Sequence, residues 1–266
     1  MATRTIAGSR GIVTGASSGI GRAIAIELAK NGARVLAVAR RGDRLADLAS
    51  AWYAPASQAN FGGSMEILAG DICNPAIRTA AIVQAKEALG GLDFLVNSAG
   101  ISSVNRFAES TPERLREIID VNFFAPAELI RTAIPELRQG NRPIVVNIGS
   151  ILGHLGIPWH ADYCASKFAL QGLSESLRPE LAKLGIDLLM VSPGTTKTEL
   201  YLQDAGRSRL PWPQPHGVSS EYVARKTVRA MAAGRREIIP NSRGRLLVCL
   251  SRWCPWFINR LMTKYG

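Results

Sequence analysis

Short apolar runs alternate with amphipathic helical patterns along most of this chain, and this alternation restricts the possible folds more than any other feature. Each run suits one buried strand, and the segments between the runs can hold helices. The runs cover residues 12–13, 35–39, 65–69, 92–96, 144–148, 186–191 and 237–240. Buried strands that alternate with helices form parallel sheets covered on both faces. The 266 residues, 47% of them hydrophobic, suit one large α/β domain or two small ones. We expect a single domain with a doubly wound parallel sheet of about seven strands.

A glycine-rich turn follows the first apolar run and leads directly into a helical pattern. Strand, turn and helix in this order bring bare backbone N–H groups and a positive helix N-terminus to one point, which is a site for a pyrophosphate. Glycine lets the backbone turn sharply and approach the phosphates. A plain connection between the two elements is the alternative. The residues of the expected site are Gly15, Ser17, Ser18, Gly19, Ile20 and Gly21.

The second apolar run, residues 35–39, ends in Arg40 and Arg41. In a nucleotide-binding βαβ unit this end faces the adenosine ribose, where a carboxylate would accept from the 2′-hydroxyl and select NAD. Two guanidiniums and no carboxylate suit a 2′-phosphate instead, so we expect NADP. Two solvated arginines at the start of a loop are the alternative.

Tyr163 and Lys167 are four residues apart, so in a helix they share one face. A cation there favours the phenolate and lowers a tyrosine pKa that starts near ~10, which suits a general acid or base. Ser150 follows the run 144–148, where its hydroxyl can hold a carbonyl oxygen beside the phenol. Tyrosine and lysine also occur at this spacing by chance, so the pair needs support from the rest of the chain.

Taken together, the motifs resemble those of the short-chain dehydrogenase/reductase family, nicotinamide-dependent oxidoreductases with a single-domain Rossmann fold. They follow the family's order and spacing across roughly residues 8–240. Ser98 departs from the family pattern, which most often has a second Asn there, but a small polar residue can still serve the turn. The matching motifs are Thr14-Gly15-x-x-x-Gly19-x-Gly21, Asp71-Ile72, Asn97-Ser98-Ala99-Gly100, Asn122, Ser150, Tyr163-x-x-x-Lys167 and Pro193-Gly194-x-x-x-Thr198.

The resemblance implies a catalytic role for four of these residues. Tyr163 donates a proton to a carbonyl oxygen that Ser150 positions. Lys167 lowers the pKa of Tyr163 and binds the nicotinamide ribose, and Asn122 binds a water that passes protons to solvent. The implied reaction transfers a hydride between NADPH and a ketone or aldehyde, with reduction as the favoured direction.

The resemblance also implies the set of cofactor-binding residues and a homodimer or homotetramer as the assembly. The implied cofactor contacts are Gly15, Ser17, Ser18, Gly19, Ile20, Gly21, Arg40, Arg41, Asp71, Ile72, Asn97, Ala99, Gly100, Tyr163, Lys167, Pro193, Gly194, Thr196 and Thr198.

Two loops are expected to border the substrate. By resemblance, residues 151–161 line the mouth of the site. Residues 199–217 are apolar, aromatic and proline-rich, which fits a lid over an uncharged, partly lipophilic substrate and equally fits a passive stiff loop. His154 and His160 have no carboxylate or cysteine at ligand spacing, so we expect loop residues and no metal. The catalytic domain would then span residues 1–242.

Prolines and a short apolar pattern lead to three local expectations. Residues 43–48 suit a short helix, followed from residue 51 to 63 by an irregular connection. Pro179 is expected to kink the helix that carries Tyr163. Pro126 and Pro135 are expected to bend the helix that begins near Thr111.

Positive charge is concentrated in the last quarter of the chain. Twelve Lys and Arg follow residue 200, against three acids, and the net charge of the whole chain is +11. Such a field favours phosphates, nucleic acid or acidic lipid. No nucleic-acid recognition motif accompanies it, so we expect a small-molecule substrate and no nucleic-acid partner.

The C-terminal tail, residues 243–266, contains five basic residues and no acid. Pro255 is expected to divide it into two short helices. One apolar stripe is expected along Leu246, Leu250, Trp253, Phe257 and Leu261. The tail packs on its own subunit, joins a neighbouring subunit or lies on an acidic membrane surface, and the sequence leaves these three alternatives open.

The cysteine pattern favours a reducing compartment. Cys73, Cys164, Cys249 and Cys254 fit neither a zinc spacing nor a dense disulfide framework. Nothing near Met1 resembles a signal peptide, and no apolar run approaches the ~18 residues that span a bilayer. We expect a cytoplasmic protein that is soluble or peripheral to a membrane.

Overall fold

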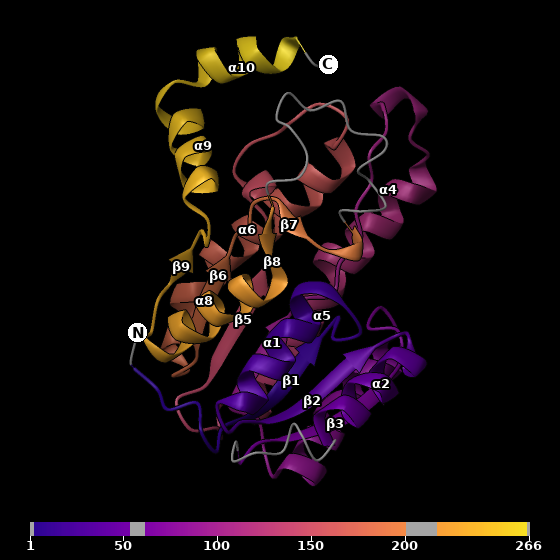
Figure 1. Ribbon diagram of the computed structural model, residues 1–266, viewed down its shortest axis with the longest axis vertical. Coiled ribbons are helices and arrows are strands. Elements are labelled where there is room, and N and C mark those ends of the chain that lie inside the picture. The colour runs from indigo at the N-terminus through magenta and orange to yellow at the C-terminus, as the bar shows by residue number, and fades with distance from the viewer. Residues whose placement is uncertain (1–2, 54–61, 201–216, 265–266) are drawn as a thin grey trace.

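Seven parallel strands form one sheet in a computed structural model that describes residues 3–53, 62–200 and 217–264 (Figure 1). The strands lie in the order β3-β2-β1-β4-β5-β6-β9. The order reverses between β1 and β4, and ligands of such sheets bind at the carboxyl ends of the strands beside this switch. The strands are β1 (Arg10–Thr14), β2 (Arg34–Ala39), β3 (Ser64–Ala69), β4 (Phe94–Asn97), β5 (Ile144–Ile148), β6 (Asp187–Val191) and β9 (Glu237–Ile238).

Helices cover both faces of the sheet, which confirms the predicted doubly wound single domain. One face packs against α1 (Gly19–Lys30), α2 (Gly42–Tyr53) and α8 (Ser220–Ala232). The other face packs against α3 (Pro75–Gln84), α5 (Ala125–Leu137) and α6 (Ala161–Lys183). The remaining helical segments of the core are η1 (Ala85–Leu89), η2 (Phe107–Glu109), α4 (Pro112–Ile119), η3 (Asp120–Phe124) and η4 (Ile151–Gly153).

Burial on both faces explains why the strands read as continuous apolar runs. Successive residues of a strand point to opposite faces. Ile12 and Leu188 lie in the core on the α3–α5–α6 side, whereas their neighbours Val13 and Leu189 lie in the core on the α1–α8 side. Each position therefore needs an apolar side chain, and no polar alternation remains.

The helix after β2 is longer than predicted. Instead of ending at Leu48, α2 continues to Tyr53. Leu45, Leu48 and Trp52 recur at three- and four-residue spacing, and all three are buried against the sheet. Burial of this apolar face stabilises more than one further turn that the short pattern did not suggest. Residues 54–61 of the predicted connection lie outside the described part of the chain.

Two helices contain prolines in their interior. The structure describes α6 as one helix that continues through Pro179. In the segment that begins at Pro112, the helix type changes at the π-helical turn η3, which lies before Pro126 and Pro135. Pro126 lies in the first turn of α5, directly after η3.

A second, two-stranded sheet was not predicted. β7 (Thr196–Lys197) pairs in parallel with β8 (Val218–Ser219), with Thr196 opposite Val218 and Lys197 opposite Ser219. This pairing joins the two ends of the segment in which the lid was predicted. Apart from Glu199, Leu200 and Gly217, the predicted lid lies outside the described residues.

The tail forms two helices, α9 (Ser242–Trp253) and α10 (Pro255–Thr263), so the predicted division at Pro255 is confirmed. The predicted single stripe is wrong. Val248, Ile258 and Met262 are buried, whereas Trp253 and Phe257 are exposed. The chain leaves helical geometry at the residue between the two helices, so one helical period does not continue across both.

Candidate active site

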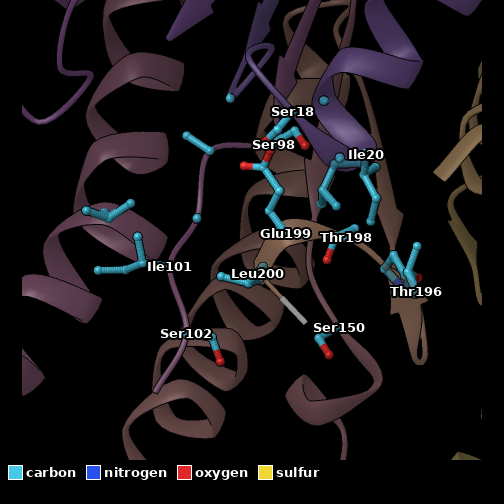
Figure 2. A pocket seen from close by; sticks show the side chains of 18 of the residues that line it. Ser18, Ile20, Ser98, Ile101, Ser102, Ser150, Thr196, Thr198, Glu199 and Leu200 are labelled. Atoms are coloured by element: carbon cyan, nitrogen blue, oxygen red, sulfur yellow. The ribbon is translucent and has the colours of Figure 1, made fainter. Parts of the chain in front are cut away.

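Loops at the carboxyl ends of six strands border a cavity of about 450 Å³ (Figure 2). Its wall includes the glycine-rich turn after β1, the end of β2 and the loops after β3, β4, β5 and β6. The first turns of α6 close the remaining side. Every residue predicted for the site borders this cavity except Asn97 and Asn122.

The glycine-rich turn has a shape that side chains would prevent. Gly15 and Gly19 have φ angles of +67° and +55°, in the left-handed region. A Cβ on Gly15 would lie 2.7 Å from the backbone nitrogen of Ala99, and a Cβ on Gly21 would lie 2.4 Å from the Gly15 oxygen. The cap residue of α1, Ser18, makes no side-chain hydrogen bond to the helix end. The first N–H groups of α1 therefore remain available to an anion in the cavity.

Buried polar side chains fix the loop after β4 against the turn. The Thr14 hydroxyl accepts hydrogen bonds from the backbone N–H of Ser98 (3.0 Å) and of Ala99 (3.1 Å). Asn97 points away from the cavity and donates to the Asn147 side chain (2.9 Å) on the neighbouring strand. Asn97 thus holds strands β4 and β5 in register behind the site.

Arg41 forms a basic end of the cavity together with the two serines of the turn. Its guanidinium donates to the Ser17 hydroxyl (3.1 Å), to the Ser18 hydroxyl (2.7 Å) and to the Glu199 carboxylate (2.7 Å). Arg44 donates to the other oxygen of Glu199 at 3.2 Å. These guanidiniums hold the pKa of Glu199 below its usual value. Figure 2 shows the Glu199 side chain extended toward Ser18. The Glu199 carboxylate therefore already binds Arg41, one of the two arginines predicted to bind the 2′-phosphate.

At the other end of the cavity, α6 presents Tyr163 and Lys167 beside Ser150. The Lys167 ammonium lies 5.6 Å from the centre of the Tyr163 ring and donates to the carbonyl oxygen of Ile148 at 3.1 Å. Burial lowers the Lys167 pKa to about 8, so the side chain keeps its charge at neutral pH. The Ser150 hydroxyl accepts from the Leu152 N–H (3.1 Å) and donates to no other described residue, which leaves its proton for a ligand.

Asn122 lies one layer behind the cavity, in the π-helical turn η3. Its side-chain amide donates to the Ile101 carbonyl and to the Ser166 hydroxyl and accepts from the Ile101 N–H, each at 2.9 Å. Both amide hydrogens are thus used within the protein. The side chain braces the Ile101 segment, which lines the cavity, against α6.

The sequence prediction missed several residues that line the cavity. Most of them follow directly on a predicted strand or motif, and parallel strands place such residues at the ligand-binding edge. The contact of Glu199 with Arg41 was also missed, because it joins residues 158 positions apart and no local pattern predicts it. The missed residues include Val38, Gly70, Ile101, Ser102 and Val121, whereas Ile151, Leu152, Ile157 and His160 belong to the predicted mouth 151–161 and Glu199 and Leu200 to the predicted lid.

Within residues 3–53, 62–200 and 217–264, no three His, Cys, Asp or Glu side chains lie close enough to hold a metal ion. His160 borders the cavity, and its ring nitrogen Nδ1 lies 3.0 Å from the Pro158 carbonyl oxygen. His154 lies 3.0 Å from the Ser192 hydroxyl.

Replacing Lys167 by methionine is expected to raise the melting temperature at neutral pH by a few degrees. Because the pKa is about 8 in the folded state against 10.5 as the ordinary value, the buried ammonium destabilises the fold by about 3 kcal/mol below pH 8. Loss of the hydrogen bond to Ile148 offsets about 1 kcal/mol of that gain. The unfolded state binds more protons between these two pKa values, so the stability of the parent protein rises with pH there.

Thermal melts of the parent protein and the Lys167→Met variant across this pH range show which of the two has the higher melting temperature. The advantage of the variant should be largest near neutral pH and shrink as the pH approaches 10.5. Lys183→Met, at the exposed end of the same helix, is the matched control and should change little. A lower melting temperature of Lys167→Met at neutral pH would contradict the assigned destabilisation.

Comparison with known proteins identifies relatives along the whole chain. The family model described as short chain dehydrogenase matches residues 11–205. A ketoacyl reductase, HetN, of Nostoc sp. is 29% identical over 98% of this chain and 91% of its own length. A short-chain dehydrogenase/reductase of Burkholderia phymatum in complex with NAD superposes with a TM-score of 0.83, at 24% identity over 94% of both chains.

A short-chain dehydrogenase of Burkholderia cenocepacia in complex with NADP superposes with a TM-score of 0.81 at 25% identity, over 97% of this chain and 99% of that one. One solved relative therefore holds NAD and another NADP, which supports a nicotinamide cofactor without selecting between the two. The family model covers more than half of the chain, and the chain belongs to the short-chain dehydrogenase/reductase family of nicotinamide-dependent oxidoreductases.

Proposed function

We propose that this protein is an NADP-dependent oxidoreductase that reduces a ketone or aldehyde to the corresponding alcohol. The observation that carries the proposal is the single cavity bordered by both the glycine-rich turn and the group of Ser150, Tyr163 and Lys167. A nucleotide-binding end and an acid–base end thus border one cavity, as hydride transfer to a carbonyl requires.

The residues at the nucleotide-binding end fit NADP. The glycines of the turn leave open a space that side chains would fill, and the α1 N-terminus suits a pyrophosphate. Arg40 and Arg41 supply two guanidiniums for the 2′-phosphate. Asp71 and Ile72 would border the adenine, and the segment from Pro193 to Thr198 the nicotinamide side. When bound, NADPH supplies the hydride.

The residues at the other end of the cavity donate the proton that the reduced carbonyl needs. Tyr163 donates a proton to the carbonyl oxygen of the substrate. The Ser150 hydroxyl holds that oxygen in place by donating a hydrogen bond to it. The Lys167 ammonium stabilises the Tyr163 phenolate that remains, and a hydrogen bond to the Ile148 carbonyl fixes the position of the ammonium. Asn122 positions the Ile101 segment, which borders the cavity, and from there it would support the water that returns the proton.

Apolar side chains around Ser150 favour a lipophilic substrate. Ile101, Ile151, Leu152, Ile157 and Leu200 border the cavity, and apolar walls with a few polar groups suit an uncharged ligand. The relative HetN is named a ketoacyl reductase, which is consistent with a carbonyl on an apolar chain. Residues that choose among such substrates would lie in the two loops expected to border the substrate and in the tail.

We also propose a homodimer or homotetramer as the assembly, on the family resemblance, and a reducing compartment such as the cytoplasm. All four cysteines are free thiols in the structure, as expected in a reducing environment. Light scattering on the purified protein measures the number of subunits.

Loss of NADPH absorbance in the presence of a panel of carbonyl compounds tests the proposed function. We expect turnover with apolar ketones or aldehydes, much slower turnover with charged ones, and preference for NADPH over NADH. A protein that binds NADPH but consumes it with no member of a broad panel would contradict the proposed reaction.

A further inference from the structure

The two tail helices have one face that packs on the active-site loops. Val248, Ile258 and Met262 are buried against Ile151 and Leu155 of the loop after β5. Arg252 in α9 donates to the His154 ring at 3.3 Å. Burial lowers the pKa of His154, which keeps the ring neutral and able to accept this hydrogen bond. The tail is therefore fixed in place on its own chain, and its other face is presented to the outside.

That outer face carries large apolar side chains in contact with water. Trp253 is 82% exposed, Trp256 70%, Leu246 61% and Phe257 46%, all within twelve residues of chain. The rings of Trp256 and Phe257 contact each other edge to face, with centroids 6.0 Å apart. Exposed aromatic residues gathered in this way mark a contact surface rather than ordinary surface variation. We call these four residues the tail face.

Exposed cations surround the tail face. Arg243, Arg245, Arg252, Arg260 and Lys264 are all exposed, and no Asp or Glu follows Glu237 in the chain. The expected partner therefore combines an apolar layer with a negatively charged surface. A second copy of this chain is a poor match, because a symmetric contact would set two such cationic faces against each other.

We propose that the tail face docks on an anionic lipid bilayer, with Trp253, Trp256 and Phe257 at the level of the headgroups and the arginines on the lipid phosphates and carboxylates. Basic helices with exposed Trp and Phe lie in the plane of the membrane interface in this manner. Within the described residues no helix combines the length and apolar character that crossing a bilayer requires. The contact is thus peripheral and reversible. Figure 1 shows α9 and α10 at the end of the molecule, where a flat surface can approach them.

Sedimentation of the full-length protein with lipid vesicles tests the proposal. We expect the protein to pellet with vesicles of phosphatidylcholine and phosphatidylserine, to remain in the supernatant with phosphatidylcholine alone, and to be released at high salt. This assay uses neither cofactor nor substrate, so its outcome is independent of the proposed enzymatic function.

Trp253→Ser combined with Trp256→Ser separates docking by the tail face from general adsorption of a basic protein. Both side chains are mostly exposed, so the fold should not change. We expect the apparent affinity for the acidic vesicles to fall by about tenfold or more. Phe107→Ser, at an aromatic residue that is 69% exposed on η2, is the matched control and should bind as the parent does.

Three results would overturn the proposal. The protein does not pellet with the acidic vesicles, or the double tryptophan variant binds them as strongly as the parent. In the third, the double variant has a lower molar mass than the parent in lipid-free light scattering, which would assign the tail face to a subunit interface. Weaker vesicle binding at unchanged molar mass supports docking on lipid.

Discussion

Replacing Tyr163 by phenylalanine is expected to lower kcat for carbonyl reduction by roughly a thousandfold, because the ring stays in place while the proton donor is lost. The affinity for NADPH should be nearly unchanged, since the phosphate-binding residues lie at the other end of the cavity. Initial rates at saturating NADPH and a fluorescence titration of NADPH binding measure the two effects separately.

The chain contains its own control for this variant. Tyr222 and Lys226 on α8 have the same four-residue spacing, and the Lys226 amine lies 5.6 Å from the Tyr222 ring centre, the same distance as in the Tyr163–Lys167 pair. Tyr222 does not border the cavity, and its hydroxyl donates to the Pro240 carbonyl. Tyr222→Phe should therefore keep its activity. Full activity of Tyr163→Phe would refute the assigned proton donor.

Replacing Arg41 by alanine is expected to weaken NADPH binding by about 10- to 100-fold and NADH binding much less. A charged hydrogen bond to the 2′-phosphate contributes about 1.5–3 kcal/mol, and NADH has no phosphate at that position. Titrations of both cofactors with the parent and the variant give the ratio. Arg40→Ala, at the neighbouring exposed guanidinium, shows whether the two arginines share the phosphate. Equal losses for NADPH and NADH would show that Arg41 has no role in selecting the phosphate.

Glu199→Gln should act in the opposite direction. The Glu199 carboxylate already accepts from Arg41 and Arg44, so a 2′-phosphate has to displace it. A neutral amide competes less well for a guanidinium, and NADPH binding should become tighter while NADH binding changes little. Glu117→Gln removes a comparable exposed ion pair, with Arg114 at 2.6 Å, and is the matched control. Tighter binding of both cofactors alike would argue against competition for the phosphate position.

The sequence was sufficient to predict the fold and most of the cavity wall because both depend on local patterns. Continuous apolar runs follow from strands buried on both faces, and parallel strands place the residues after them at one edge. The two Tyr-x-x-x-Lys pairs show the limit of such patterns. Tyr163 and Tyr222 have the same spacing to a lysine, but Lys167 is buried beside the cavity whereas Lys226 is exposed on α8, a difference that the spacing does not show.

Features that depend on distant packing were not predictable in this way. The Glu199–Arg41 ion pair and the Arg252–His154 hydrogen bond each join segments that local periodicity treats separately. The tail stripe was misjudged because a single helical period was extended across Cys254, where the chain turns. Asn122 was expected at the cavity, but the π-helical turn η3 directs its side chain to the Ile101 backbone instead.

The short pairing of β7 with β8 has a consequence for how substrate preference can diverge among proteins of this design. Backbone hydrogen bonds close the base of the intervening segment, whatever side chains that segment carries. Mutations, insertions or an exchanged loop between Leu200 and Gly217 should therefore leave the sheet and the nucleotide end intact. New specificities can arise there by grafting, without redesign of the catalytic scaffold.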